Sequence, residues 1–196
     1  IVALDWMMLE QVCAFFGAHR ELDGCAVSVN FSARQFLAPD AERRVLDTLE
    51  RHGLAPTRLK LELTERVLAG DIRRVRAVME ALAARGVEFY LDDFGTGYSN
   101  LSSVVSLPLQ YVKVDRSLLE AATNGGGGAL LLRAVVETFR AMGRGILLEG
   151  VETPEQYALA CTLRADRLQG YYLARPMPGE ELCALMRSGA RRTRRT

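Results

Sequence analysis

Apolar residues follow two spacings along the chain, one typical of helices and one typical of strands. Between residues 2 and 20, Leu4, Met8, Val12 and Phe15 recur at helical spacing. Further helices are predicted over 40–52, 71–85, 129–142, 154–163 and 179–187. Short apolar runs predict six strands, at 27–30, 59–65, 87–91, 111–115, 145–150 and 167–172. Strands that alternate with helices are typical of an α/β fold with a parallel sheet.

A polar residue stands near the end of each predicted strand. The six are Asn30, Glu62, Asp92, Lys113, Glu149 and Gln169, separated by 32, 30, 21, 36 and 20 residues. Each gap fits one strand–helix unit, and eight units of about 31 residues make an ordinary (β/α)8 barrel. We therefore expect about six of the eight strands of a TIM-type barrel within residues 1–187, with the strand at 27–30 at an edge. An open Rossmann-like sheet is the alternative, although no GxGxxG follows the first strand.

The carboxyl ends of parallel strands meet at one rim, so these polar side chains should gather there. Glu62, Asp92, Asp93 and Glu149 would bring together four carboxylates, which repel one another unless cations neutralise them. Oxygen ligands without His or Cys select hard ions such as Mg²⁺ or Mn²⁺, and two such ions suit phosphoryl chemistry. A single acidic residue at a strand end is usually a solvated cap, but six polar positions at equivalent ends indicate a site. Lys113 either snorkels to the surface or orients a water and counters developing charge there.

Composition and motif spacing exclude several other classes of protein. The 196 residues are 49% hydrophobic and 25% charged, an ordinary globular composition with enough apolar mass for a large core. No zinc site is expected, because the two histidines form no HExxH pair and none of the four cysteines has CxxC spacing. Asp93-Phe94-Gly95 alone is weak evidence for a kinase, since no HRD loop accompanies it.

Charge is uneven along the chain. The net charge is +1, but residues 187–196 hold five arginines and no acid, which leaves −4 on residues 1–186. A body of this charge gives no general reason to bind DNA, and we expect residues 188–196 to form a disordered, solvated tail. No run approaches a membrane span and no signal peptide is visible, so a cytoplasmic location is expected. A start without Met inside a helical pattern suggests a piece of a longer protein, whose other domains would decide any membrane anchoring.

Six stretches match one pattern of motifs, in order and over nearly the whole chain. They are Ser28–Arg34, Glu62–Glu65, Asp92–Ser99, Lys113–Arg116, Glu149–Glu152 and Gln169–Tyr172, followed by Pro176-Met177-Pro178. Together they resemble the EAL domain, the bacterial cyclic di-GMP phosphodiesterase family, and the stretch from Asp92 to Ser99 is highly specific. The resemblance implies a (β/α)8 barrel that hydrolyses cyclic di-GMP to linear pGpG with two Mg²⁺ or Mn²⁺ ions.

The resemblance also implies roles for individual residues. The expected ligands of a first metal ion are Asn30, Glu62 and Asp92, and those of a second are Asp92, Asp93 and Glu149. Lys113 and Gln169 are expected to position the attacking water and the phosphate. Glu65 resembles the glutamate that anchors the 94–100 loop, through which the family couples metal binding to dimerisation, so a homodimer is expected. Glu152 resembles a further glutamate of the site.

The chain departs from the family pattern at its start. Nothing in residues 1–29 matches the Glu-Ala-Leu motif, whose Glu is a metal ligand, or the Arg that follows it. The 196 residues alone are therefore expected to hydrolyse cyclic di-GMP poorly, whereas the full protein is expected to be an active phosphodiesterase. The alternatives are a degenerate domain that serves as a cyclic di-GMP receptor, and a signalling scaffold. EAL domains commonly follow sensor or diguanylate cyclase domains, so such domains are expected in the full protein.

Overall fold

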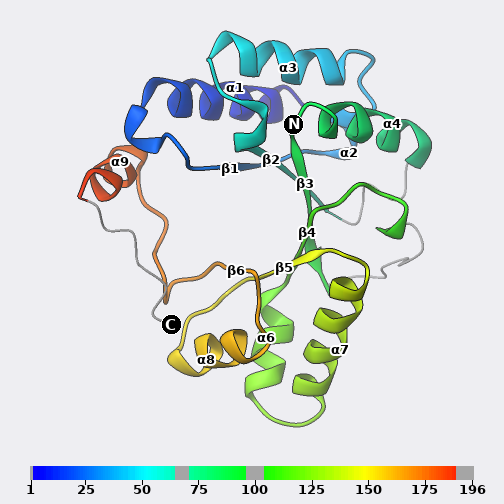
Figure 1. The fold of residues 1–196 in the computed structure, drawn as a ribbon, viewed down its shortest axis with the longest axis vertical. Coiled ribbons are helices and arrows are strands. Elements are labelled where there is room, and N and C mark those ends of the chain that lie inside the picture. The colour runs from blue at the N-terminus through cyan, green and yellow to red at the C-terminus, as the bar shows by residue number, and fades with distance from the viewer. Residues whose placement is uncertain (1, 65–70, 96–103, 189–196) are drawn as a thin grey trace.

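Six parallel strands form one curled sheet in the computed structural model, which describes residues 2–64, 71–95 and 104–188 (Figure 1). Each strand is hydrogen-bonded to the next in chain order: β1 (Val27–Asn30), β2 (Leu59–Thr64), β3 (Glu88–Phe94), β4 (Tyr111–Val114), β5 (Gly145–Leu148) and β6 (Arg167–Leu168). All five pairs are parallel, so the carboxyl ends of the strands lie on one rim. The predicted α/β fold with six barrel strands is confirmed, and β1 lies at an edge of the sheet as predicted.

Helices cover the outer side of the curled sheet (Figure 1). The first half of the chain supplies α1 (Val2–Ala18), η1 (Arg20–Leu22), α2 (Ala33–Phe36), α3 (Ala41–Arg51), η2 (Pro56–Arg58) and α4 (Ile72–Ala83). The second half supplies α6 (Arg116–Thr123), α7 (Gly128–Ala141), α8 (Pro154–Thr162) and α9 (Gly179–Arg187), which lies beside η1. Within the described ranges, no helix is long and apolar enough to cross a membrane.

Successive side chains of each strand point alternately to the apolar core under the helices and to the barrel interior. In β2, Leu59, Leu61 and Leu63 are at most 1% exposed and belong to the apolar core between sheet and helices. Lys60 and Glu62, between them, face the opposite side, because successive side chains of a strand point to opposite faces. The same alternation turns Tyr90, Asp92, Tyr111 and Lys113 toward the barrel interior from β3 and β4, whereas β5 turns Gly145 and Leu147 there.

Two helices and several strand ends differ from the sequence-based expectation: β3 runs to Phe94 rather than ending at Leu91, and β5 ends at Leu148 rather than at Gly150. The pattern missed α2 and α6, both of which begin directly after a strand. α6 starts where Asp115 accepts a hydrogen bond from the backbone N–H of Ser117 at 2.9 Å, so Asp115 caps a helix rather than extending β4. β6 has two residues instead of six, and Gln169 therefore follows the strand rather than lying in it.

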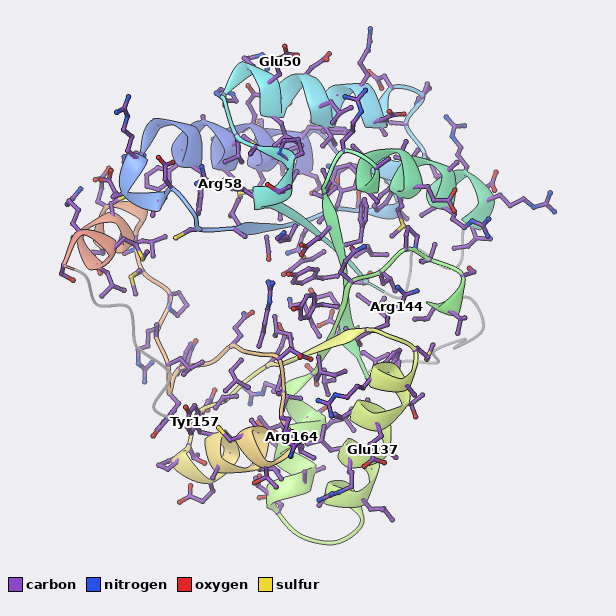
Figure 2. All side chains as sticks on the ribbon, viewed as in Figure 1. Glu50, Arg58, Glu137, Arg144, Tyr157 and Arg164 are labelled. Atoms are coloured by element: carbon purple, nitrogen blue, oxygen red, sulfur yellow. The ribbon has the colours of Figure 1, made fainter. Side chains whose placement is uncertain are left out.

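Two arginines tie together the loops at the amino ends of neighbouring strands (Figure 2). Arg58, just before β2, donates to the carbonyl oxygens of Leu22 and Cys25, both at 2.9 Å. Arg144, just before β5, donates to the carbonyls of Leu107 and Leu109 at 3.1 and 2.5 Å. These bonds align the strand starts and so help to align the carboxyl ends that carry the candidate site.

Gly17 marks a close approach of α1 to the end of α3, since an added Cβ would lie 2.0 Å from the His52 carbonyl oxygen. We expect Gly17→Ala to lower the free energy of unfolding by about 2 kcal/mol, although Ala is intrinsically better than Gly inside a helix by about 1 kcal/mol. Equilibrium unfolding in urea measures this. Gly127→Ala is the control, because an added Cβ there meets nothing within 4 Å. Equal stability of the two variants would contradict the close packing.

Candidate active site

The ammonium group of Lys113 lies at the centre of the rim. Its Nζ is 2.8 Å from Oε2 of Glu62, 2.7 Å from Oδ1 of Asp92 and 2.9 Å from Oε1 of Glu149. The lysine side chain is 5% exposed and the three carboxylates are 11–15% exposed. Polar ends of β2, β3, β4 and β5 therefore converge, and one positive charge faces three negative charges in a largely water-excluded place.

Burial and charge act in opposite directions on the pKa values of this group. Burial lowers the pKa of Lys113, but the hydrogen bonds to Asp92 and Glu62 outweigh it, and the pKa lies above its ordinary value. Burial raises the pKa of the Glu149 carboxyl; Lys113 lowers it, the charges of Asp92 and Glu62 raise it, and the net shift is upward. The lysine thus stays protonated at neutral pH, and the pKa of the Glu149 carboxyl is raised first by burial and then by its two acidic neighbours.

A bulge in β3 brings two consecutive aspartates to the same rim. Strict alternation would send Asp92 and Asp93 to opposite faces. The pairing with β4 shifts register between Leu91 and Phe94, and Asp93 has a φ of 57°, a left-handed conformation that Asp tolerates better than most residues. The Asp93 N–H donates to Oδ1 of Asp92 at 3.0 Å, and Phe94 returns to the core. The bulge therefore presents both carboxylates at the rim.

Three carboxylates are arranged so that they could hold a metal ion. One oxygen from each of Asp92, Asp93 and Glu149 lies within 4.8 Å of the others. With Glu62 the rim carries four carboxylates against the single ammonium of Lys113, which leaves a surplus of negative charge. Oxygen donors with surplus charge fit a hard divalent cation such as Mg²⁺ or Mn²⁺.

A pocket of about 290 Å³ opens beside this cluster. Its lining comprises Asp5, Asn30, Phe31, Ser32, Glu62, Thr64, Asp92 and Asp93. Four of the five predicted metal ligands therefore share one pocket, and Lys113 connects them to Glu149. Sequence reasoning missed Asp5 of α1, whose Oδ2 is buried and has no hydrogen-bond partner in the part of the chain that the structure describes. An acidic residue among apolar neighbours in a helix carried no signal that it would face the strand ends.

Gln169 and Glu152 lie in a second, adjacent pocket of about 410 Å³. The lining residues are Arg116, Gly150, Glu152, Gln169, Gly170, Tyr171, Ala174, Arg175 and Pro176. Arg116 is 3.7 Å from Glu152, and the Arg175 guanidinium lies 4.6 Å from the Tyr171 ring centre. Sequence reasoning predicted Glu152 and Gln169 as site residues but missed both arginines. Glu149 shares Lys113 with Asp92 of the first pocket and directly precedes Gly150 of the second, so the rim offers an acidic half and a half that carries arginines.

Several predicted features lie outside the described residues. Glu65 and residues 96–100 of the 94–100 loop are among them, as are residues 189–196 of the C-terminal tail. The loop anchor, the dimer contact and the tail remain predictions.

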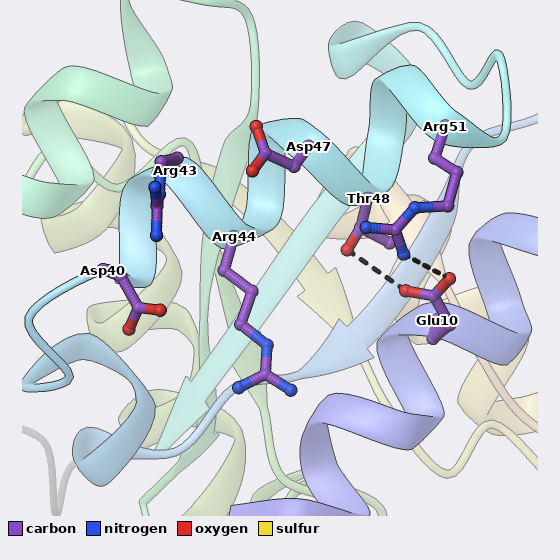
Figure 3. A pocket seen from close by; sticks show the side chains of 7 residues that line it. All are labelled: Glu10, Asp40, Arg43, Arg44, Asp47, Thr48 and Arg51. Atoms are coloured by element: carbon purple, nitrogen blue, oxygen red, sulfur yellow. Dashed lines mark hydrogen bonds and ion pairs between the residues drawn. The ribbon is translucent and has the colours of Figure 1, made fainter.

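A third pocket, of about 230 Å³, lies between α1 and α3 and away from the rim (Figure 3). Glu10 accepts from Arg51 at 2.7 Å and from Thr48 at 3.3 Å, and it lies 2.7 Å from Nε2 of His52. Three acids and three arginines line this pocket. This pocket differs from the rim because its charges are balanced and no strand-end residue lines it. Its side chains connect α1 to α3.

Glu10 should make stability depend on acid pH. The hydrogen bond to His52 and that to Arg51 lower the pKa of the Glu10 carboxyl below its ordinary value of 4.5. A lowered carboxyl pKa adds stability that is present above the unfolded-state pKa and is lost as pH falls through the folded-state pKa. We expect Glu10→Gln to cost about 0.5 kcal/mol near neutral pH, because the side chain is 40% exposed and solvent screens it. Urea unfolding of both proteins from pH 6 to pH 3 should show the difference shrinking with acid, and a constant difference would contradict the assignment.

The amino-acid sequence matches one known protein family over most of its length. The EAL domain family matches residues 1–176, which is most of the chain. The chain belongs to the EAL domain family. The described residues of this EAL domain carry the acidic rim at the carboxyl ends of its strands.

Curated relatives of this EAL domain are multidomain signalling proteins. The bifunctional diguanylate cyclase/cyclic di-GMP phosphodiesterase MucR of Pseudomonas aeruginosa is 35% identical over 189 residues, which cover 94% of the chain and 27% of MucR. The oxygen sensor protein DosP of Escherichia coli is 32% identical over 163 residues, which cover 83% of the chain and 20% of DosP. The chain therefore spans about a quarter or less of the length of these relatives.

Solved structures confirm the barrel fold of the EAL domain. A complex of the MucR phosphodiesterase with cyclic di-GMP superposes with a TM-score of 0.83 at 35% identity, covering 93% of this chain and 74% of that one. Klebsiella pneumoniae BlrP1 in a manganese and cyclic di-GMP complex gives a TM-score of 0.77 at 27% identity, covering 86% and 43%. A calcium and cyclic di-GMP complex of BlrP1 gives a TM-score of 0.81 at 27% identity, covering 89% and 44%.

A Glu-Ala-Leu tripeptide does occur in this EAL domain, at residues 80–82, but not at a strand end. It lies within α4, where Glu80 pairs with Arg76 at 3.0 Å on the exposed helix surface. This tripeptide therefore contributes nothing to the rim.

Proposed function

We propose that this EAL domain hydrolyses cyclic di-GMP to linear pGpG within its full protein, with two divalent cations held at the rim. The observation that carries the proposal is the cluster of Asp92, Asp93 and Glu149 oxygens beside Lys113. Relatives with 27–35% identity are described as phosphodiesterases or as cyclic di-GMP complexes with manganese or calcium, which supports the same substrate and a divalent ion.

The residues of the acidic half would hold the ions. Asn30, Glu62 and Asp92 are proposed ligands of one ion, and Asp92, Asp93 and Glu149 of the other, with Asp92 shared. Hard divalent cations neutralise a phosphodiester and lower the pKa of water, which is the chemistry that this reaction requires. The surplus carboxylate charge of the rim supports their binding.

The remaining rim residues would act on the substrate directly. The protonated ammonium of Lys113 is a fixed positive charge among the carboxylates, and it would orient a water and counter the charge that develops on the phosphate. Gln169, in the adjacent pocket, would position the phosphate through its carboxamide, and Glu152 would support that pocket through Arg116. Binding geometry of this kind supplies much of the rate of an enzyme.

Assembly forms a further part of the proposal. Glu65 would anchor the 94–100 loop, and a homodimer would form through that loop. Because the relatives are several times longer than this chain, we also propose sensor or diguanylate cyclase domains in the full protein. Size-exclusion chromatography with light scattering of the full protein tests the dimer.

Incubation with cyclic di-GMP and Mn²⁺, followed by chromatography for pGpG, tests the activity. The full protein should produce pGpG, whereas the 196 residues alone should produce little. Ca²⁺ should inhibit turnover, because it prefers more ligands and looser geometry than Mg²⁺. Absence of pGpG from the full protein at saturating Mn²⁺ would overturn the proposed hydrolysis.

A receptor that binds cyclic di-GMP without hydrolysing it is the second candidate. Isothermal titration with cyclic di-GMP separates the two functions. A full protein that binds the nucleotide but forms no pGpG would be a receptor.

A further inference from the structure

The barrel interior just below the acidic rim carries a polar cluster that the proposed chemistry does not use. Arg167 of β6 donates a hydrogen bond to the hydroxyl of Tyr90 on β3, and its guanidinium lies 4.3 Å from the ring centre of Tyr111 on β4. The two tyrosine rings are 4.8 Å apart. The interior of a TIM-type barrel is usually filled with branched apolar residues, so this cluster calls for an explanation.

The contact between Arg167 and Tyr90 joins strands that are not neighbours. β4 and β5 lie between β3 and β6 in the sheet. On a flat sheet three strand spacings would put β3 and β6 about 14 Å apart, at the limit of what two long side chains can span. The hydrogen bond therefore acts across the curl of the sheet and holds β6 toward β3.

The cluster is built to stay in place. Tyr90 is 1% exposed, and its hydroxyl donates to Oε2 of Glu88 at 3.2 Å while it accepts from Arg167. Burial raises the pKa of Tyr90 above its ordinary value, although Arg167 opposes this, so the hydroxyl keeps the proton that it donates. Tyr111 lies over Gly145 of β5, where an added Cβ would be only 2.4 Å from the ring.

β6 needs such an anchor more than the other strands. It has two residues, and within the described ranges it is paired only with β5. Gln169 follows two residues after Arg167, just beyond the end of the strand, and lines the second pocket of the rim. Its backbone is held by two bonds, from its N–H to Leu148 at 2.9 Å and from the N–H of Val151 to its carbonyl at 3.0 Å.

We propose that Arg167, held by Tyr90, is a positioning residue for Gln169. The side chain of Arg167 fixes the direction of the short edge strand, and the carboxamide two residues later is thereby held beside the acidic half of the rim. This inference rests on the proposed function for its substrate, but the placement of the strand can be measured without any substrate.

The test compares four variants of the 196-residue chain: Tyr90→Phe, Arg167→Gln, the double variant, and Tyr157→Phe. Tyr90→Phe keeps the buried ring and removes only the hydroxyl. Arg167→Gln changes a residue at the edge of the sheet, and it tests the same contact if Tyr90→Phe disturbs folding. Tyr157→Phe, on α8, is the matched control, because it removes a tyrosine hydroxyl that takes no part in the bond between Arg167 and Tyr90 and keeps the ring that lies 5.3 Å from that of Tyr172.

Amide hydrogen exchange reads out the strand directly. We expect the Gln169 and Val151 amides to exchange about tenfold faster in Tyr90→Phe and Arg167→Gln, because local opening of β6 becomes easier. The Val112 amide in the sheet centre should be unchanged, as should every amide in Tyr157→Phe. Unchanged exchange at Gln169 in both single variants would overturn the proposal.

Cyclic di-GMP affinity, measured by titration in Ca²⁺, is the second readout. Each single variant should bind about tenfold more weakly with Mn²⁺ affinity unchanged, and the double variant should be no weaker than the singles, because both changes break one contact. Additive losses would overturn the proposal.

If the unchanged chain and the full protein bind no cyclic di-GMP, the proposed function fails, and hydrogen exchange alone still decides the role of Arg167. Arg167→Lys should not restore affinity, since an ammonium lacks the planar fork that stacks on Tyr111.

Discussion

Asp92→Ala in the full protein is expected to abolish Mn²⁺ binding at the rim and to lower cyclic di-GMP turnover by about a thousandfold or more, equal to roughly 4 kcal/mol of transition-state stabilisation. Asp92 is the carboxylate that the two proposed metal ions share as a ligand. It lines the pocket with Asn30 and Glu62, and its oxygens lie near those of Asp93 and Glu149. Removing it therefore weakens both proposed ion positions at once.

Titration of Mn²⁺ and chromatographic measurement of pGpG check this prediction. Asp92→Asn is the companion variant, because it keeps an oxygen that can accept from Lys113 and so separates the loss of charge from misfolding. Asp47→Ala is the control for removal of an exposed acid far from the rim. Near-parental turnover by Asp92→Ala at low Mg²⁺ would contradict the assignment of two ions.

The sequence predicted the fold and the gathering of the rim because both follow from local periodicity and the parallel arrangement. A polar residue that closes an apolar strand must reach the carboxyl rim when every strand runs the same way. That reasoning placed Glu62, Asp92, Lys113 and Glu149 together, and in the structure the Lys113 Nζ lies 2.7–2.9 Å from one oxygen of each of the three carboxylates.

Other features depend on geometry that periodicity does not encode. The bulge that turns Asp93 to the rim requires a positive φ at that residue, and the neighbouring residues in the sequence do not specify this backbone conformation. Asp5 reaches the pocket only because α1 packs beside β1. The contact of Arg167 with Tyr90 depends on the curl of the whole sheet, which joins residues 77 positions apart. These long-range placements are set by packing rather than by local pattern.

The length of β6 shows the same limit. The run from Arg167 to Tyr172 is typical of a strand, yet pairing ends at Leu168. Beyond that point the chain bends into a tight approach, since an added Cβ at Gly170 would lie 2.2 Å from the Val151 carbonyl oxygen. Gln169 is consequently presented at the start of a turn, in the second pocket rather than the first.

Lys113→Met is expected to destabilise the metal-free protein by about 3 kcal/mol, because removal of one partner from a buried ion cluster leaves uncompensated charges. Three carboxylates share this ammonium, and their side chains are at most 15% exposed. Protonation of Glu149, whose pKa is already raised, would become more favourable still. A raised carboxyl pKa means that stability lost by the variant at neutral pH is partly regained as pH falls.

Divalent cations should restore much of that loss, and this separates a metal site from an ordinary buried ion pair. At a hundredfold excess over its Kd, an ion adds about 2.7 kcal/mol to the free energy of unfolding. Without the lysine the carboxylates attract a cation more strongly, so the gain on adding Mn²⁺ in place of EDTA should be larger in Lys113→Met than in the unchanged protein.

The only other lysine of the chain supplies the matched control. Lys60 is also 5% exposed and pairs with Glu88 at 2.9 Å, but it lies below the rim. Lys60→Met should lose stability for the same physical reason, yet Mn²⁺ should stabilise it no more than it stabilises the unchanged protein. Thermal unfolding of the three proteins with Mn²⁺ and with EDTA decides the matter. An equal Mn²⁺ shift in both lysine variants would mean that the carboxylates around Lys113 form an internal ion cluster and not a metal site.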